Sequence, residues 1–194
     1  MEKKTLKQIL AFISEAGMLK RLKRSGWNVV GIENPESVAE HSFRCAVIGY
    51  ALAKMERVPP YQVLLMTLFG DIHEARIGDL HKMAQRYIHI EKGEDHALRE
   101  QISSLPQSFK TELHTMRSLY RAQKSKESII ARDADILECL LQAKEYYEQG
   151  FCEAKKFYQK APRFLKTKSA RALWRKAKTS PLNDWWQTLT EFKR

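Results

Sequence analysis

The stretch YQVLLMTLFGDIHE, residues 61–74, begins as a nearly continuous apolar run and ends as a cluster of charged side chains. Pro59 and Pro60 precede it, and proline is tolerated in the first turn of a helix, where its missing N–H has no intrahelical partner to lose. Apolar side chains fill most positions up to Phe69, so we expect a central helix that is covered on all sides. The polar cluster therefore starts where a core helix ends.

Helical periodicity extends from this stretch in both directions along the chain. Ser37 and Glu40 have the spacing of a capping box, so a helix should begin near residue 38. Gly150 should follow the end of another helix, because glycine favours that position. We expect helices over 4–18, 38–56, 94–104, 107–122 and 126–149, an irregular connection over 80–95, a loop over 23–37, and basic helices at the end of the chain.

The apolar positions of two long helices identify the expected core. The 38–56 helix should bury Phe43, Val47, Ile48, Tyr50, Ala51 and Leu52, and the 126–149 helix should bury Ile129, Ile130, Ile136, Leu137, Leu140 and Leu141. Because no segment alternates like a strand and no repeat is present, the chain is predicted to be all-α. Its 194 residues suit one domain, 1–194, with a core at about 10–150 and a basic helical extension at about 151–194.

Positive charge is concentrated near the C-terminus. Residues 151–194 hold twelve Lys or Arg and three Asp or Glu, a net charge of +9 out of +11 for the whole chain. Such a segment attracts phosphate-bearing partners or forms the solvated face of helices, and we favour the solvated face. Phe157, Tyr158, Phe164 and Trp174 are interleaved with these charges and could stack on nucleic-acid bases, but their near-helical spacing favours core packing.

Cysteine use and hydropathy indicate the compartment. Cys45, Cys139 and Cys152 lie within apolar or helical patterns, and an odd count without motif spacing argues against a disulfide framework or a zinc knuckle. We therefore expect the reducing cytoplasm. No run approaches the roughly 20 apolar residues of a membrane span, so no membrane partner is expected.

Three ionisable residues stand among core positions on three different predicted helices. His41 lies in the first turn of the 38–56 helix, Asp71 at the end of the central helix, and Asp135 in the apolar stripe of the 126–149 helix. A buried charge is costly unless it is paired or bound to a metal, and helical proteins build metal sites from facing helices. Each residue taken alone is also compatible with a structural role, as a capping residue or an ion-pair partner.

Four segments, in this order, resemble the HD-domain phosphohydrolases, and in particular the branch that contains the 5′-deoxynucleotidases. They are LKRLKRSGW at 19–27, PESVAEHSF at 35–43, GDIHEARIGDL at 70–80 and ARDADILECLLQAKEYYEQG at 131–150, and the resemblance covers residues from about 10 to 150. It implies a helical HD domain, a divalent cation such as Mn²⁺, Co²⁺ or Mg²⁺, and a nucleoside 5′-monophosphate as substrate. It also implies a homodimer.

The resemblance further assigns roles to individual residues. It implies metal ligands at His41, Asp71 and Asp135, a catalytic glutamate at Glu74, and nucleotide contacts at Arg24, Trp27 and Asp79. In such a site the cation lowers the pKa of a bound water toward about 7. Glu74 would orient or deprotonate that water, and Arg24 would hold the phosphate in a bidentate pair.

Gly70 is the departure from the family pattern, in which a histidine precedes the metal-binding aspartate. Gly70-Asp71 stands where His-Asp is implied, so one metal ligand is missing. A neutral imidazole is a good ligand for transition metals, so we expect a weak or empty metal site. His73 lies three residues after Gly70, on the same surface of a continuing helix, and is the alternative ligand. The histidines expected at the surface are His81, His89, His96 and His114.

A glycine in the interior of a helix is unfavourable, and the sequence around Gly70 shows no turn that would need one. The sequence does not distinguish a naturally degenerate site from a recently introduced glycine. Two functions are therefore kept. The first is a metal-dependent phosphohydrolase of nucleoside 5′-monophosphates, impaired by Gly70. The alternative is a non-catalytic nucleotide- or nucleic-acid-binding protein that keeps Arg24 and the basic segment.

Overall fold

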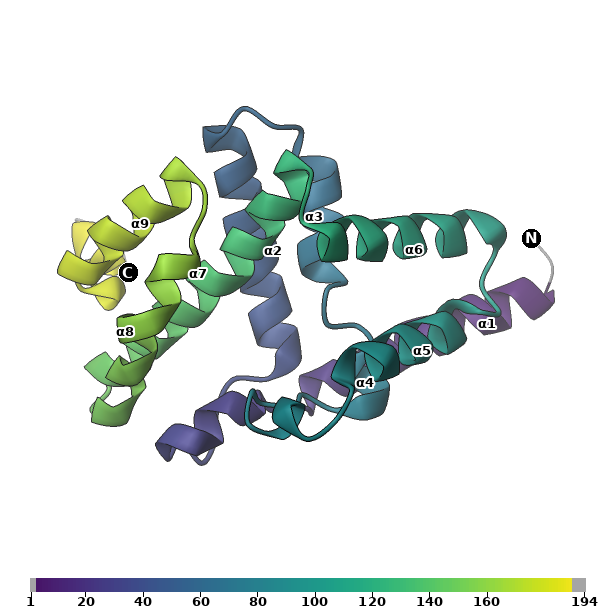
Figure 1. Cartoon of the computed structure of the whole chain (residues 1–194), viewed down its shortest axis with the longest axis horizontal. Helices are drawn as coiled ribbons and strands as arrows, with labels where there is room; N and C mark the ends of the chain where they lie inside the picture. Colours follow the sequence, from purple (N-terminus) through teal and green to yellow (C-terminus); the bar gives the residue numbers. More distant parts are fainter. Residues whose placement is uncertain (1–2, 190–194) are drawn as a thin grey trace, which may run out of the picture.

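Helices pack around three central members (Figure 1). The computed structural model describes residues 3–189 of the 194-residue chain. The elements are α1 (Lys3–Ala16), η1 (Gly17–Lys20), η2 (Ser25–Val30), α2 (Val38–Met55), α3 (Pro60–Leu68), α4 (Glu74–Ile77), η3 (Ala84–Arg86), α5 (Ile90–Ile102), α6 (Gln107–Ala122), α7 (Lys126–Glu148), η4 (Cys152–Lys155), α8 (Lys156–Lys160), η5 (Ala161–Phe164), α9 (Lys168–Thr179) and η6 (Leu182–Thr188). The all-α prediction is confirmed, and no helix among the described residues is long and apolar enough to cross a membrane.

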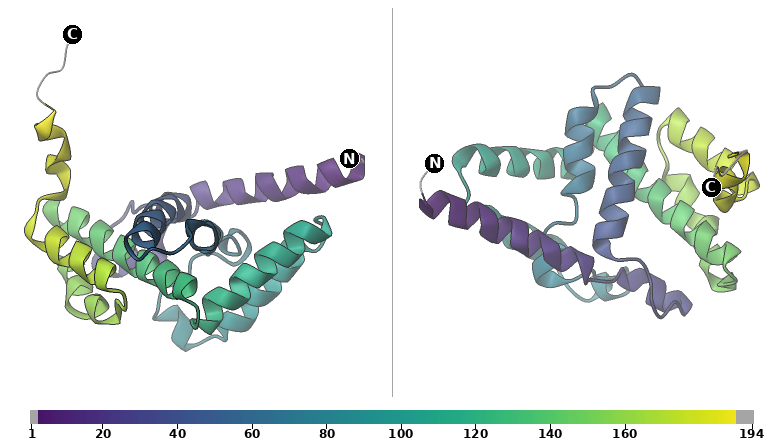
Figure 2. Two further views of the ribbon diagram at one scale, coloured as in Figure 1. Left: turned by 90° about the horizontal axis from the view of Figure 1, so that it is seen from above. Right: turned by 180° about the vertical axis from the view of Figure 1, so that it is seen from behind.

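The centre of the molecule is formed by α2, α3 and α7. α2 and α3 lie side by side, and α7 packs against both of them (Figures 1 and 2). Their shared surface is the main hydrophobic core, whose members Leu52, Val63, Ile130, Leu137 and Leu140 are each at most 1% exposed. The central position predicted for the apolar stretch at 61–69 is confirmed.

Local sequence signals fix the ends of these helices. The Ser37 hydroxyl accepts a hydrogen bond from the backbone N–H of Glu40, and the Glu40 carboxylate accepts one from the backbone N–H of Ser37. The predicted capping box is therefore present. Gly150 follows the end of α7 with a φ of 102°, a conformation that favours glycine. The segment 23–37, predicted as a loop, contains the short helix η2.

The predicted buried face of α2 is wrong in part. Ile48 and Leu52 lie in the core, but Phe43, Val47 and Tyr50 are 68%, 52% and 47% exposed. α2 carries apolar side chains on two faces, and α3 and α7 cover the face that holds Ile48 and Leu52. The other three residues form a row at spacings of four and three on the outer surface of the helix.

The basic C-terminal elements share the main core. Leu165, Ala170 and Trp174 belong to it and are at most 6% exposed. The buried carboxylate of Asp133 on α7 accepts hydrogen bonds from the backbone N–H groups of Lys166, at 2.9 Å, and Thr167, at 2.6 Å. α7 thus anchors the segment that leads into α9. The predicted division into a core and an extension stays a prediction.

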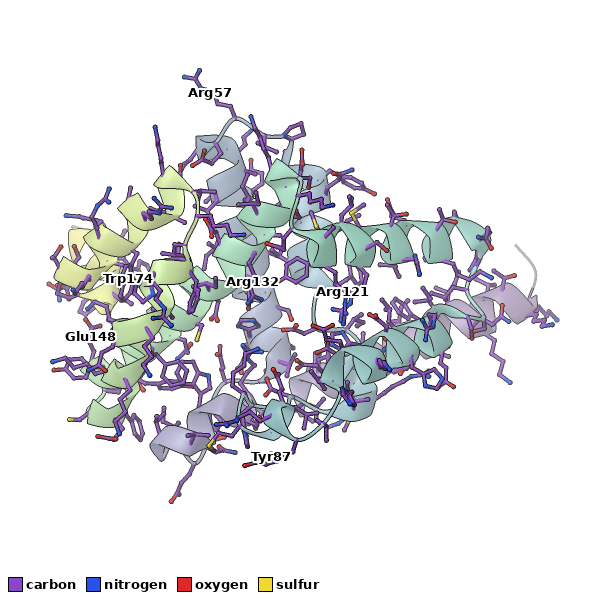
Figure 3. The ribbon with its side chains drawn as sticks, in the orientation of Figure 1. Arg57, Tyr87, Arg121, Arg132, Glu148 and Trp174 are labelled. Atoms are coloured by element: carbon purple, nitrogen blue, oxygen red, sulfur yellow. The ribbon has the colours of Figure 1, made fainter. Side chains whose placement is uncertain are left out.

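Glu94 on α5 connects that helix to α6 and to the polar cluster after α3. Its carboxylate lies 2.6 Å from Arg117 Nη2, 3.0 Å from Arg121 Nη2 and 3.7 Å from His73 Nε2. Arg121 lies between α6 and α5 (Figure 3). Burial alone would raise the pKa of Glu94, but the contacts with His73 and Arg117 lower it to about 2.

Glu94 should therefore stabilise the fold in a pH-dependent way. A carboxyl group whose pKa is lowered on folding stabilises the native state above its unfolded pKa, about 4.5, and loses that effect as the pH falls through its folded value, about 2. Glu94→Gln should lower the free energy of unfolding by about 2 kcal/mol at neutral pH. Urea unfolding at neutral pH and at pH about 3 measures the difference. Glu91→Gln, at a carboxylate that is 81% exposed, is the control and should have little effect. A Glu94→Gln deficit of equal size at both pH values would contradict this account.

Candidate functional site

His41 stands where α2, the turn after α3, and α7 meet. The capping box at Ser37 starts α2, so His41 falls in its first turn, with its ring inside the protein at 1% exposure. Its Nε2 lies 3.3 Å from Asp135 Oδ1 on α7 and 3.6 Å from Asp71 Oδ2 in the turn after α3. The three residues predicted as metal ligands are therefore brought together at one imidazole nitrogen.

The other ring nitrogen of His41, Nδ1, contacts a buried carboxylate. Nδ1 is in short contact with Oε2 of Glu138, a fully buried residue on α7. Oε1 of Glu138 accepts hydrogen bonds from Nε (3.0 Å) and Nη2 (2.8 Å) of Arg44, and Arg44 Nη1 also donates to both oxygens of Glu145. Because Glu138 accepts the hydrogen on Nδ1, Nε2 is the nitrogen that faces the two aspartates.

Arg24 approaches the same aspartate from the loop before η2. Its Nη1 is 3.5 Å from Asp71 Oδ2 and 3.1 Å from Asp79 Oδ2. The other oxygen of Asp79 accepts hydrogen bonds from the backbone N–H (3.1 Å) and the hydroxyl (2.7 Å) of Ser25. Burial opposes the charged guanidinium, but Asp71 and Asp79 hold the pKa of Arg24 well above its ordinary value. Asp79 therefore fixes the start of η2 and the direction of Arg24.

Glu74 has an oxygen that lacks a partner. Its Oε2 is buried and makes no hydrogen bond with the described part of the chain. Burial and the negative charges of Asp71 and Asp79 raise the pKa of Glu74 to about 10. A buried oxygen without a partner marks a place where a water, a cation or a substrate oxygen would be stabilised.

Trp27 takes a structural position beside this site. Its ring is 3% exposed, packs edge-on against Tyr146 at a centroid distance of 5.1 Å, and packs at a tilt against Phe157 at 4.6 Å. Its Nε1 donates to Glu36 Oε1 at 3.0 Å. Burial and the charge of Glu138 raise the pKa of Glu36 to about 7. The buried ring attaches η2 to Tyr146 and Phe157. A direct contact between Trp27 and a nucleotide stays a prediction.

The chemistry of His41, Asp71 and Asp135 fits a divalent cation. In a tetrahedral site with metal–ligand bonds of about 2.0 to 2.2 Å, neighbouring donor atoms lie about 3.3 to 3.6 Å apart. The two distances from His41 Nε2, 3.3 and 3.6 Å, have that size. The orphaned oxygen of Glu74 leaves an acceptor free for a ligand of the cation. The trio of His41, Asp71 and Asp135 does not, however, place one donor atom each within 4.8 Å of the others, so the two aspartates would have to approach each other to share one cation.

Cys45 is a fourth donor near His41, but its orientation is unsuitable. His41, Cys45 and Asp135 each place one donor atom within 4.8 Å of the others. Cys45 Sγ is 3.4 Å from Nε2 and 3.9 Å from Nδ1 of His41, so the sulfur lies against the ring rather than along the Nε2 lone pair. Burial raises the pKa of the Cys45 thiol to about 12, which keeps it protonated at neutral pH.

Gly70 has a packing role that the sequence did not reveal. α3 ends at Leu68, and the chain turns through Gly70 toward Asp71. A Cβ added at Gly70 would lie 2.8 Å from the backbone oxygen of Met66. The expectation that this glycine serves no turn is therefore wrong, because the end of α3 approaches it too closely for a side chain.

His73 faces Glu94 on α5. It is 3% exposed, its Nε2 is directed at Glu94, and its Nδ1 is buried without a hydrogen-bond partner among the described residues. These contacts do not support His73 as the replacement ligand. Of the histidines predicted at the surface, His89, His96 and His114 are exposed, while His81 is half-buried and accepts a hydrogen bond from the backbone N–H of Ala84.

Sequence reasoning missed the layer behind His41. Glu138 lies three residues after Asp135, on the same surface of α7, and stands among apolar positions. A glutamate in an apolar stripe is the signal that could have identified it, because such a charge needs a partner. Arg44 lies three residues after His41, but nothing near it in the sequence identifies Glu138 as its partner. Ser25 gave no signal beyond its place next to Arg24.

Comparisons with known proteins match most of the chain. A family model described as an HD domain matches residues 16–174. The chain is similar to the 5′-deoxynucleotidase HDDC2 of Homo sapiens, with 31% identity over 142 residues that cover 72% of this chain and 69% of the relative. It is equally similar to the 5′-deoxynucleotidase HDDC2 of Dictyostelium discoideum, with 31% identity over 72% of this chain and 78% of the relative.

Solved structures show the same arrangement of helices. A conserved hypothetical protein from Pyrococcus furiosus superposes with a TM-score of 0.74 and 31% identity, over 87% of this chain and 96% of the other. The HD phosphohydrolase DatZ of cyanophage S-2L, bound to dA and one catalytic Zn²⁺ ion, superposes with a TM-score of 0.53 and 15% identity, over 86% and 96%. At that identity the second likeness concerns the fold alone.

Proposed function

Because the chain belongs to the HD-domain family and is a phosphohydrolase, we propose that it removes phosphate from nucleoside 5′-monophosphates, deoxynucleotides included. The observation that carries the proposal is the approach of Asp135 and Asp71 to Nε2 of His41, at 3.3 and 3.6 Å, with Arg24 3.5 Å from Asp71. The relatives named 5′-deoxynucleotidases support the substrate class. Mn²⁺, Co²⁺ and Mg²⁺ remain the candidate cations.

In this proposal His41, Asp71 and Asp135 hold the cation, which would lower the pKa of a bound water and offset charge on the phosphoryl oxygens. Arg24 binds the phosphate, exchanging its contact with Asp71 for two charge-assisted hydrogen bonds to phosphate oxygens. Glu74 offers its free Oε2 to the attacking water and orients it.

Asp79 and Trp27 act on the same loop in this proposal. Asp79 holds Ser25 and Arg24, so it keeps the guanidinium aimed at the substrate phosphate. Its predicted contact with a sugar hydroxyl is kept as part of the proposal. Trp27 holds η2 in place by donating a hydrogen bond from its Nε1 to Glu36.

Gly70 should leave this site with a low cation affinity. Restoring a histidine there is the direct test, but any side chain at Gly70 meets the Met66 backbone oxygen. Gly70→Ala is therefore the matched control for strain at the end of α3. We expect Gly70→His to bind Mn²⁺ or Co²⁺ about tenfold or more tightly than Gly70→Ala, because a ligand is added. Isothermal titration calorimetry measures the affinities. Equal affinities of the two variants, or full activity of the natural chain, would contradict an impaired site.

Phosphate release tests the function itself. Ribo- and deoxyribonucleoside 5′-monophosphates are incubated with each cation, using the natural chain, Gly70→His and Gly70→Ala. Release that depends on both the cation and the nucleotide supports the proposal. Nucleotide binding without phosphate release by any variant would favour the alternative, a non-catalytic nucleotide-binding protein that keeps Arg24.

A homodimer is also proposed. The outer row on α2, Phe43, Val47 and Tyr50, is 47–68% exposed, and an apolar face of this kind fits a second copy of the chain. Val47 also lines an apolar groove of about 360 Å³ between α2, α7 and α9. The cytoplasmic location stays a prediction that rests on the three cysteines.

A further inference from the structure

The segment 155–178 carries a dense positive charge that the phosphohydrolase site does not use. Ten of its residues are Lys or Arg and none is Asp or Glu. We call the exposed side chains of these ten residues the basic surface: Lys155, Lys156, Lys160, Arg163, Lys166, Lys168, Arg171, Arg175, Lys176 and Lys178. Within residues 3–189, the basic surface makes one ion pair, between Lys156 and Glu153. The other nine residues make no ion pair within the described part of the chain, although Lys168 lies close enough to Glu56 to lower the pKa of that carboxyl group.

The fold turns this charge outward. α9 buries Ala170 and Trp174 in the main core, and Trp174 also packs edge-on against Tyr158 at a centroid distance of 5.4 Å (Figure 3). Ala170 and Trp174 are therefore covered by the protein, Leu173 and Ala177 border the apolar groove between α2, α7 and α9, and the basic residues of α9 face solvent. Phe157, Tyr158 and Trp174 pack in the interior, as their spacing predicted. The same prediction is wrong for Phe164, whose ring is 53% exposed.

The basic residues of α9 form a row that suits a line of phosphates. Lys168, Arg171, Arg175 and Lys178 follow one another at spacings of three and four, which places them on one surface of the helix. Ten residues of helix extend about 15 Å. A nucleic-acid strand of about four nucleotides covers a similar length of duplex axis.

We propose that the basic surface binds the sugar–phosphate backbone of nucleic acid without base specificity. Helices that bind membranes insert their apolar face into the bilayer, and two residues of that face of α9, Ala170 and Trp174, are buried in the core. Phe164 adds a feature suited to nucleic acid, because its ring is 53% exposed with the Arg163 guanidinium 4.8 Å from its centroid. An exposed aromatic beside an arginine can stack on a base.

The basic surface is separate from the proposed phosphohydrolase site. No hydrogen bond or ion pair among the described residues joins a side chain of the basic surface to Arg24, His41, Asp71 or Asp135. α8, η5 and α9 lie at the opposite end of the molecule from α1 (Figures 1 and 2). The proposal therefore stands or falls independently of the proposed reaction. Its variants should leave phosphate release from small nucleotides unchanged.

The test uses the full chain and a labelled single-stranded DNA of about 20 nucleotides of mixed sequence. The variant combines Lys168→Gln, Arg175→Gln and Lys178→Gln. The control combines Lys4→Gln, Lys7→Gln and Lys20→Gln, which removes the same charge from exposed positions on α1 and η1. Fluorescence anisotropy across a salt series gives the dissociation constants, and circular dichroism confirms folding.

We expect the α9 variant to bind the oligonucleotide at least about tenfold more weakly, and its slope of log K against log salt to fall by about 2, since each lost contact with single strands removes about 0.7. The α1 control should bind nearly as the natural chain does. Equal losses of oligonucleotide affinity in the two variants would overturn the proposal, because binding would then depend on the net charge of the protein and not on the basic surface. Binding to phosphatidylserine vesicles with no measurable binding to the oligonucleotide would overturn it in favour of a membrane surface.

Discussion

Replacing His41 by Gln should lower phosphate release from nucleoside 5′-monophosphates by at least about 100-fold. Loss of an outer partner of a metal ligand already costs about 10–100-fold in affinity or activity, and His41 is the residue on which the whole cluster converges. Its Nε2 is the atom that both Asp135 and Asp71 approach, at 3.3 and 3.6 Å. Glutamine has a single amide group in place of the two ring nitrogens of histidine, so it cannot face the aspartates and Glu138 in the same way.

The measurement is steady-state phosphate release at saturating Mn²⁺, with cation affinity determined by calorimetry on the same samples. His96→Gln is the matched control, because the His96 side chain is 68% exposed and lies away from the site. Since His41 is buried, thermal unfolding is recorded for each protein, and Asp135→Asn provides a second variant at the same cluster. Activity within a few-fold of the natural chain in both variants would show that this cluster does not hold the catalytic cation.

Glu138→Gln should reduce cation affinity about 10–100-fold although it changes no ligand. In the natural chain Arg44 donates to Oε1 of Glu138, while Oε2 accepts from Nδ1 of His41. Arg44 has no acceptor, so a glutamine must turn its carbonyl oxygen toward Arg44 and its amide –NH₂ toward His41. Nδ1 then accepts a hydrogen bond, the ring hydrogen moves to Nε2, and the lone pair that would bind the cation is blocked.

Glu145→Gln is the matched control for this second prediction. Glu145 also accepts hydrogen bonds from Arg44, at 2.7 and 2.8 Å, but its carboxylate does not contact His41. Calorimetry gives the cation affinities, and nitrogen NMR of the His41 ring reports which nitrogen carries the hydrogen. A purely structural role for Glu138 would lower stability in both variants without changing the tautomer. That outcome would contradict the proposed positioning.

Features decided by neighbouring residues could be predicted from the sequence. The capping box needs Ser37 and Glu40 alone, and the ends of α2 and α7 followed from such local signals. His41 and Asp135 could be selected because a charged group among apolar positions needs a partner. The resemblance to a known family supplied the order in which the four segments contribute to one site.

Features decided by distant contacts could not be predicted. Periodicity shows that α2 has apolar residues on two faces, but which face α3 and α7 cover depends on the whole fold, so Phe43, Val47 and Tyr50 were misplaced. Gly70 approaches the Met66 backbone oxygen closely because α3 ends at Leu68. The apolar pattern continues to Phe69, so the sequence does not show this end. Arg44 was missed because its partner Glu138 lies 94 residues away in the sequence.

Asp133 has a consequence for how the chain matures. α7 carries Asp135, and the buried carboxylate of Asp133, two residues earlier, has its hydrogen-bond donors in the later backbone N–H groups of Lys166 and Thr167. During synthesis, α7 emerges with this carboxylate unpaired and with part of its apolar face still uncovered by Leu165 and Trp174. The proposed cation site therefore acquires this support only after the segment up to Trp174 has been synthesised and has packed on α7. A nascent chain paused before that point would expose a target for chaperones or proteases.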